Sequence, residues 1–270
     1  MNNHTQTLTI RYIQAPFFQI RQTLHSDRAY ESHAHSSLSI GYMLEGKTRF
    51  TLPKGAFLLQ KGALALIEPH TQHACNPLEH TQRSYVMVYF DAAFCLKLQS
   101  ELFGKNQTLL PLRTPLVFHQ RLCETFERVI DRLIKSYSEL HVRALETWLR
   151  EFLWLYCEPD SPQNAPSSMR EIARFLESRI DEPLSLSSLA QRFGYNPFVL
   201  LRRFKAAYGC TPKHYGLDQR IEHAKELLQK GISIAMCAQY CGFSDQSHFH
   251  RFFKRRTALT PKEYQVNFVQ

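Results

Sequence analysis

The chain has 270 residues, of which 44% are hydrophobic, and a formal net charge of +9. This length allows two domains, and this apolar content supports ordinary globular cores. No run of about 18 apolar residues occurs, which predicts no membrane-spanning segment. Because the start lacks the apolar core of a signal peptide, we expect a cytoplasmic protein.

The first ninety residues alternate between apolar and polar positions, which is the period of β-strands. Ile40, Tyr42 and Leu44 form one such series, and Gly-containing turns separate the series. Short strands joined by regular turns predict a sandwich or barrel of the jelly-roll type over residues 8–91. We expect Ile40, Tyr42 and Phe50 to line its interior, where a small molecule can bind.

Three histidines of this region have the spacing of a cupin metal site. His33 and His35 form an H-x-H pair before one strand, and His73 follows the segment ALALIEP. Imidazoles are good ligands for first-row metals, but Ser39 stands where such a site has a carboxylate. We therefore predict that the three histidines are polar groups at the mouth of an effector pocket, without metal or cofactor. A zinc site remains the open alternative.

From residue 92 the apolar residues recur at helical spacing. A short helix is predicted over residues 92–103, and two longer amphipathic helices follow up to residue 157. These two helices are predicted to pack on each other, on the barrel or on a second subunit. Residues 158–167 contain three Pro and almost no apolar residue, which predicts an interdomain linker.

The last hundred residues contain one supersecondary unit twice. Residues 189–205 and a second stretch ending at Lys254 share Ala, Gly, Arg, Phe and Lys at offsets of 48 or 49 residues. Each stretch combines a short helix, a turn at Gly194 or Gly242, and a second helix with a buried apolar stripe and an outer face. These are the parts of a helix-turn-helix that enters a major groove.

Local residues predict where the two recognition helices begin. Asn196 followed by Pro197 predicts the start of the first, and Ser244 is the predicted N-cap of the second. Cys237 and Cys241 share one helical face of the second unit, and we expect buried thiols there rather than metal ligands.

The same region is basic. Residues 168–270 hold 16 Lys and Arg against 9 Asp and Glu. An excess of positive charge beside the two units is what a phosphate-binding module requires.

Residues 184–264 resemble the DNA-binding domain of AraC/XylS-type transcriptional regulators. The matching segments are LSLSSLAQRFGYN, RRFKAAYGCTP, RIEHAKELL, AQYCGFSDQSHFHRFFKR and LTPKEY. The stretch EPHTQHACNP resembles the cupin-like sensor domain of many members. Ala258 stands where the family has Gly, so we expect this helix junction to do without a left-handed Gly.

The resemblance implies a two-domain α+β protein. Residues 1–157 would form a cupin-like β-barrel with a helical pair, for effector binding and dimerisation. Residues 168–270 would form an all-α double helix-turn-helix domain. The implied function is a bacterial transcriptional regulator, such as an activator, that binds double-stranded DNA and a small-molecule effector. A homodimer and a contact with RNA polymerase are also expected.

Carried over position by position, the resemblance also implies which residues meet DNA. Arg202 and Arg251 are suited to guanine, and Arg256 is a further expected phosphate partner. The full set of expected DNA-binding residues is Phe198, Val199, Leu201, Arg202, Lys205, Gln246, Ser247, His248, His250, Arg251, Lys254 and Arg255.

Two other functions fit the sequence. One is a metal-dependent cupin enzyme fused to a DNA-binding module, and the other is a regulator whose N-terminal domain only dimerises. The missing carboxylate at Ser39 argues against the enzyme, so no enzymatic activity is predicted.

Overall fold

The β-rich half of the chain, here called the β-domain, consists of two antiparallel sheets and three helices. The computed structural model describes residues 8–78, 81–104, 108–158, 167–182 and 185–268. The strands are β1 (Thr9–Ala15), β2 (Phe18–Ser26), β3 (Leu38–Glu45), β4 (Lys47–Leu52), β5 (Gly55–Gln60), β6 (Leu64–Ile67), β7 (Ala74–Pro77), β8 (Arg83–Phe90) and β9 (Leu116–Val117).

The strands form a six-stranded sheet and a three-stranded sheet. Their orders are β1-β2-β8-β3-β6-β9 and β5-β4-β7. This is the expected jelly-roll-like architecture, but among the described residues the hydrogen bonding does not close into one continuous barrel. The pattern of the sequence does not indicate β9, because a two-residue strand has no measurable period.

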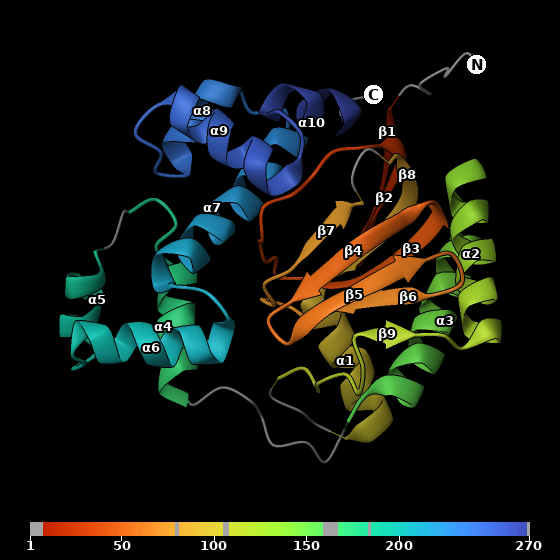
Figure 1. Cartoon of the computed structure of the whole chain (residues 1–270), viewed down its shortest axis with the longest axis horizontal. Coiled ribbons are helices and arrows are strands. Elements are labelled where there is room, and N and C mark those ends of the chain that lie inside the picture. The colour runs from red at the N-terminus through yellow and green to blue at the C-terminus, as the bar shows by residue number, and fades with distance from the viewer. Residues whose placement is uncertain (1–7, 79–80, 105–107, 159–166, 183–184, 269–270) are drawn as a thin grey trace.

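Helices cover the outer face of the larger sheet (Figure 1). They are α1 (Ala92–Phe103), α2 (Gln120–Lys135) and α3 (Glu139–Tyr156). One apolar core fills the space between them and the sheet, with Ile40 and Val88 from strands and Phe126 and Trp148 from helices. A second, smaller core lies between the two sheets and contains Phe50.

The second half of the chain, here called the helical domain, has only α-helices as regular elements within its described residues. Its helices are α4 (Ser167–Glu177), α5 (Leu186–Arg192), α6 (Pro197–Tyr208), α7 (Pro212–Gln229), α8 (Ile234–Tyr240), α9 (Gln246–Thr257) and α10 (Pro261–Phe268). We call α5 with α6 the first unit, and α8 with α9 the second unit. The long helix α7 joins them and contributes to both cores, through Tyr215 to the first and through Ile221 and Leu228 to the second.

Cap residues explain most of the helix ends. Asn196 caps α6 and Pro197 occupies its first position, as predicted. The cap of α9 is Asp245, whose side chain accepts from the amide of His248, so the prediction of Ser244 is wrong. The Ser244 hydroxyl instead donates to the Asp245 carboxylate at 3.0 Å. A carboxylate at this position also interacts favourably with the positive end of the helix dipole.

Three further expectations concern the chain as a whole. Cys237 and Cys241 are buried free thiols in the core of the second unit. Residues 159–166 of the expected linker lie outside the described residues, so the domain boundaries stay a prediction. Within the described part of the chain, no helix is long and apolar enough to cross a membrane.

Candidate functional site

A cavity of about 240 Å³ lies between the β-domain and the helical domain. One wall is the inner face of the six-stranded sheet. The others come from the three-stranded sheet and from α7, α9 and α10. We call this space the interdomain cavity. A molecule bound in it would contact both domains at once.

Part of the inner face of the six-stranded sheet is polar, most clearly along β2, which turns its apolar side toward the helices. In β2, Phe18 and Ile20 belong to the core under the helices, whereas Gln19 and Arg21 line the cavity. The same alternation places Tyr89 of β8 in the cavity. Successive side chains of a strand point to opposite faces. A sheet with helices on its outside therefore presents its polar series inward.

The apolar lining expected from the sequence is only partly present at the cavity. Ile40 packs in the core under the helices, and Phe50 lies in the core between the sheets without lining the cavity. Tyr42 borders the cavity, but its hydroxyl donates to the Glu127 carboxylate of α2 at 2.7 Å. Met43, the neighbour in sequence, lines the cavity instead. The expectation for Ile40 is therefore wrong, whereas Phe50 faces the interior between the sheets but does not border this cavity.

Two arginines are buried in the cavity without an ion-pair partner among the described residues. Arg21 is 6% exposed and Arg83 is 2% exposed. Arg21 Cζ lies 5.6 Å from the ring centroid of Tyr30 and 6.0 Å from that of Tyr12, and Nη1 donates to the Thr257 carbonyl at 3.4 Å. Within the described chain, Arg21 Nε and Arg83 Nη1 have no hydrogen-bond partner. A guanidinium stays charged in proteins, so the cavity holds positive charge that no carboxylate balances at these two residues.

Sequence reasoning missed this feature, although a signal exists. Polar residues occupy every second position of β2, at Gln19, Arg21 and Thr23, opposite the apolar series of the same strand. Tyrosines lie beside the arginines, and desolvation of their hydroxyls raises the pKa of Tyr12 to about 12 and also raises the pKa of Tyr30. These hydroxyls are therefore protonated at neutral pH and are able to donate hydrogen bonds.

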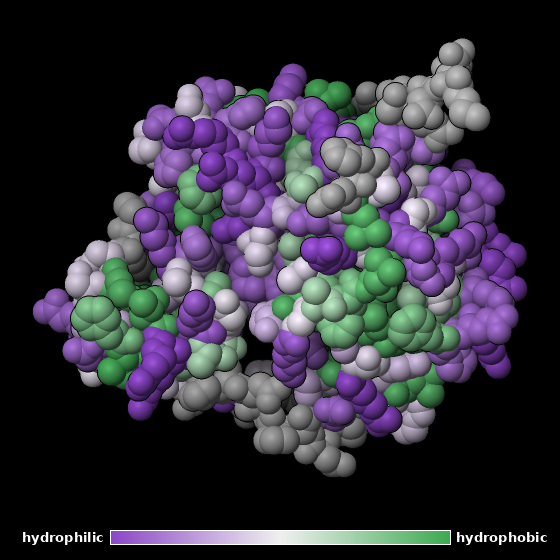
Figure 2. Space-filling view, viewed as in Figure 1, coloured by the Kyte–Doolittle hydropathy of each residue, from purple (hydrophilic) through white to green (hydrophobic). Residues whose placement is uncertain are grey.

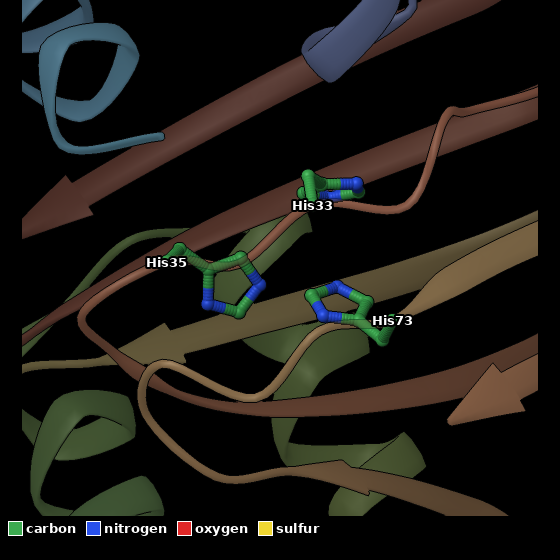
Figure 3. A group of neighbouring side chains, drawn as sticks. All are labelled: His33, His35 and His73. Atoms are coloured by element: carbon green, nitrogen blue, oxygen red, sulfur yellow. The ribbon is translucent and has the colours of Figure 1, made fainter. Parts of the chain in front are cut away.

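His33, His35 and His73 come together on the cavity wall, and Figure 3 shows their rings facing one another. His33 and His73 exchange two backbone hydrogen bonds, of 3.0 and 2.9 Å. The nitrogens that the three rings offer as ligands lie within 4.8 Å of one another. Burial lowers the pKa of His33 and His35 well below the usual value and lowers that of His73 to about 4. All three imidazoles are therefore neutral at pH 7.

A buried ionic group around Asp218 of α7 holds the two domains together. Its carboxylate accepts from the Ala34 amide at 3.1 Å and from Gln72 Nε2 at 2.8 Å, both in the β-domain. It also pairs with Arg256 Nε of α9 at 3.0 Å. Burial raises the pKa of Asp218 to about 6, against the opposing effect of Arg256. Arg256 also donates to the Ser32 carbonyl and is 8% exposed. It is therefore not available to phosphate in this arrangement, contrary to expectation.

More exposed contacts surround this group. Arg28 pairs with Glu263 at 2.9 Å and donates to the Ala258 carbonyl at 2.7 Å, and Arg255 pairs with Glu31 at 3.5 Å. The Arg28 guanidinium lowers the pKa of Glu263 to about 2. Ala258 has a φ of 57°, so this junction keeps a left-handed residue despite lacking Gly. The junction therefore does without a left-handed Gly, as expected, because Ala can adopt this conformation at a cost of about 1–2 kcal/mol.

Most of the expected DNA-facing residues lie on the surface of the two recognition helices, α6 and α9. The exposed ones are Phe198, Arg202, Lys205, Gln246, Ser247, His250, Arg251, Lys254 and Arg255. Val199, Leu201 and His248 are half-buried, and the His248 ring packs edge-on against Phe252.

The surfaces of the two units differ in polarity. Apolar side chains reach the surface over α5 and α6, whereas the surface over α8 and α9 is mainly hydrophilic (Figure 2). Phe198 at the start of α6 is 80% exposed. Such a side chain is suited to contact with thymine methyl groups.

Comparisons with known proteins match both halves of the chain. A family described as AraC-like ligand binding domain matches residues 17–153, and one described as helix-turn-helix domain matches residues 189–267. The probable transcriptional regulator LumQ of Photobacterium leiognathi is 25% identical over 254 residues, which cover 94% of this chain and 98% of that protein.

Solved structures of ToxT from Vibrio cholerae share the fold. The structure from strain O395 bound to (E)-4-(8-methylnaphthalen-1-yl)but-3-enoic acid has a TM-score of 0.66 at 14% identity, covering 98% of this chain and 100% of that one. The structure from strain SCE256 with a bound unsaturated fatty acid has a TM-score of 0.64 at 15% identity, covering 100% of this chain and 98% of that one.

Proposed function

Because this chain belongs to the AraC family of DNA-binding transcriptional regulators, we propose that its effector is a small organic anion bound in the interdomain cavity. The observation that carries the proposal is the buried guanidinium of Arg21, which has no carboxylate partner among the described residues. A buried charge without a counter-ion is costly. A ligand carboxylate would supply that counter-ion through charge-assisted hydrogen bonds.

The lining of the cavity also indicates the shape of the ligand. Tyrosine hydroxyls cluster near Arg21, and a second part of the lining is apolar. Its apolar residues are Met43, Leu59, Ala65, Ile67 and Met87. These two parts suit a molecule with an anionic group and an apolar body. The two ToxT ligands are carboxylic acids with apolar bodies, which supports this assignment.

The effector is proposed to act on the contact between the domains. Lys225 of α7, Thr257 of α9 and Tyr264 of α10 line the same cavity as the sheet residues. A ligand shifts the arrangement of two domains only by its different affinity for each arrangement. A molecule that fills this cavity contacts the docked arrangement on both sides, so it favours that arrangement.

DNA binding is proposed to use the exposed outer faces of α6 and α9, with base contacts from Arg202 and Arg251. Dimerisation, contact with RNA polymerase, activation rather than repression and a cytoplasmic location stay predictions from the resemblance. The relative LumQ is named a probable transcriptional regulator, and we propose that this protein has no catalytic activity.

The test compares carboxylic acids with uncharged analogues on the full-length protein. Affinities are measured by calorimetry for acids from benzoate to oleate, each beside its primary alcohol. We expect at least one acid to bind about tenfold tighter than its alcohol, the effect of a charge-assisted hydrogen bond. Arg21→Met should remove that preference. Arg11→Met is the matched control, because Arg11 is exposed on the neighbouring strand β1.

The regulatory role needs a second measurement. A DNA sequence that the protein selects from a random pool is used to measure affinity with and without the bound acid. An acid that binds but leaves DNA affinity unchanged would contradict the effector role. Equal binding of acids and alcohols, unaffected by Arg21→Met, would contradict the anion site itself.

A further inference from the structure

The three cavity histidines are arranged as metal ligands, with the other ring nitrogen of each already occupied. His33 Nδ1 lies 2.9 Å from the Glu31 carbonyl, and His73 Nδ1 lies 2.9 Å from the Thr71 carbonyl. A backbone carbonyl only accepts, so both Nδ1 atoms carry the proton and both Nε2 atoms are free lone pairs. Metal-binding histidines use this second hydrogen bond to fix their tautomer.

The third ring is held in a similar way. His35 Nδ1 lies 3.3 Å from the hydroxyl of Ser37 and 3.3 Å from that of Ser39. Ser39 is the residue that stands in place of a carboxylate ligand, and here it orients an imidazole instead.

The spacing suits a first-row transition metal after a small movement. Ligand nitrogens around tetrahedral zinc lie about 3.4 Å apart, as follows from a Zn–N distance of about 2.1 Å. One nitrogen from each of the three rings lies within 4.8 Å of the other two, so each has to move by about 1 Å or less. Lys225 and Arg256 near the rings oppose a cation, whereas Glu222 and Glu226 of α7 line the same cavity and favour it.

The same histidines belong to the segment on which the helical domain is docked. Residues 31–35 provide three backbone contacts to it. The Glu31 amide donates to the Arg255 carbonyl at 3.2 Å, the Ser32 carbonyl accepts from Arg256, and the Ala34 amide donates to Asp218 at 3.1 Å. His33 and His35 flank Ala34. An ion bound to both rings and to His73 would therefore hold this segment in its docked conformation.

We propose that His33, His35 and His73 bind one divalent transition metal ion of the zinc class, and that the ion strengthens the docking of the helical domain on residues 31–35. All three histidines line the interdomain cavity, so the ion would lie on its wall. The proposal is independent of the anionic effector, because its ligands and its mechanical consequence involve only this chain.

Metal binding is tested on tag-free full-length protein. After removal of bound metal with a chelator, zinc is titrated by calorimetry and the bound metal is counted by mass spectrometry. We expect one ion per chain, with His73→Ala and His33→Gln each weakening binding by more than about 100-fold, beyond the usual effect of losing only a supporting hydrogen bond. His141→Ala is the matched control, because His141 lies on α3 outside the cluster. Substoichiometric zinc that these variants do not change would overturn the site.

Docking is tested by hydrogen exchange on the same samples. Zinc should slow exchange of the Ala34 amide and of the end of α9, in the unmodified protein and in His141→Ala but not in His73→Ala. Folding of each variant is checked by the exchange of β3 and β8, which should not change. Stoichiometric zinc with unchanged exchange at Ala34 would leave a metal site but overturn its role in docking. The outcome of this zinc experiment does not depend on whether a carboxylic acid binds in the cavity. If no acid binds, the proposed anionic effector is contradicted but the metal site is not.

Discussion

The two helix-turn-helix units share a sequence pattern, but they differ in how they relate to the β-domain. At an offset of 49 residues, Arg255 and Arg256 of the second unit correspond to Ala206 and Ala207 of the first. The second unit uses these two arginines to contact Glu31, Ser32 and Asp218. In the described chain, no hydrogen bond or ion pair joins α6 to the β-domain.

The two units of the repeat therefore have different roles. The first unit presents an exposed, partly apolar recognition helix that is free to meet DNA. The second holds the end of its recognition helix against the domain that contains the cavity. Because Arg255 pairs with Glu31 and is also an expected phosphate partner, docking and DNA binding are expected to compete for the same side chain. Control by the β-domain is therefore expected to act on the second unit.

The largest expected effect comes from replacing Arg256 of the second unit with alanine, which is the residue at the equivalent position of the first unit. Arg256→Ala leaves Asp218, which is 2% exposed, without its ion pair. Removing one partner of a buried pair costs about 3–5 kcal/mol, and we expect the lower value because Ala34 and Gln72 still donate to the carboxylate. Urea denaturation of the full-length protein measures the loss. Arg255→Ala is the control, expected to cost less than about 1 kcal/mol because its side chain is 58% exposed. Equal losses of unfolding free energy in the two variants would show that the buried ion pair of Arg256 contributes no more to stability than the exposed pair of Arg255.

The next largest effect is expected on DNA affinity and base preference rather than on the stability of the protein. Arg202 and Arg251 occupy equivalent positions of α6 and α9, and both are exposed. Replacing either with Ala should cost about 1–3 kcal/mol of binding and relax the preference at one base position each, at different places in the site. Fluorescence anisotropy with single-base variants of a selected DNA site measures this. A loss that is uniform over all sequences would mean that the arginine contacts only phosphate.

A third prediction tests the polarity difference between the two units. Phe198 and Ser247 are equivalent in the repeat, and Phe198 is 80% exposed. Phe198→Ala should weaken DNA binding by about 1 kcal/mol, because apolar contact with thymine methyls is lost at about 25 cal/mol per Å². Ser247→Ala should have a smaller effect. Stability should change by less than about 0.5 kcal/mol in both. A large fall in stability for Phe198→Ala would mean that the ring packs within the domain.

The smallest expected effect comes from freeing Arg255. Glu31→Ala removes partly exposed ion pairs, at 3.5 Å to Arg255 and 3.9 Å to Arg256. Exposed pairs contribute less than about 1 kcal/mol, so DNA affinity should rise by less than about fivefold at low salt. Glu139→Ala removes an exposed pair with Arg143 on α3 and serves as the control. A fall in affinity would contradict the competition between docking and DNA binding.

The sequence predicted the parts of the helical domain well because its signals are local. Asn196, Pro197 and the repeated Phe stripe determine helix ends and faces through neighbouring residues. The cap of α9 was harder, because Ser244 and Asp245 are both good caps in adjacent positions, and only the extended backbone of Asp245 decides between them.

The cavity was less predictable because its lining depends on what covers the sheet. The alternating pattern of β3 places Ile40 and Tyr42 on one face of the strand and Met43 on the other. It does not show which of the two faces points toward the cavity. Helices that follow later in the chain cover the outer face and take the apolar set. The three histidines could be found from spacing alone. Arg21 could not be placed without knowing that its strand is buried on both faces.

The helix α7 also fixes the distance between the two units. It has 18 residues, which at 1.5 Å each span about 27 Å. Both of its ends are embedded in apolar cores, so it can neither stretch nor turn independently of the units. Inserting one residue would rotate one unit relative to the other by about 100°. Moving one DNA half by a base pair rotates it by only about 34–36°. The distance and angle between the two recognition helices are therefore properties of the protein, and an operator has to conform to them.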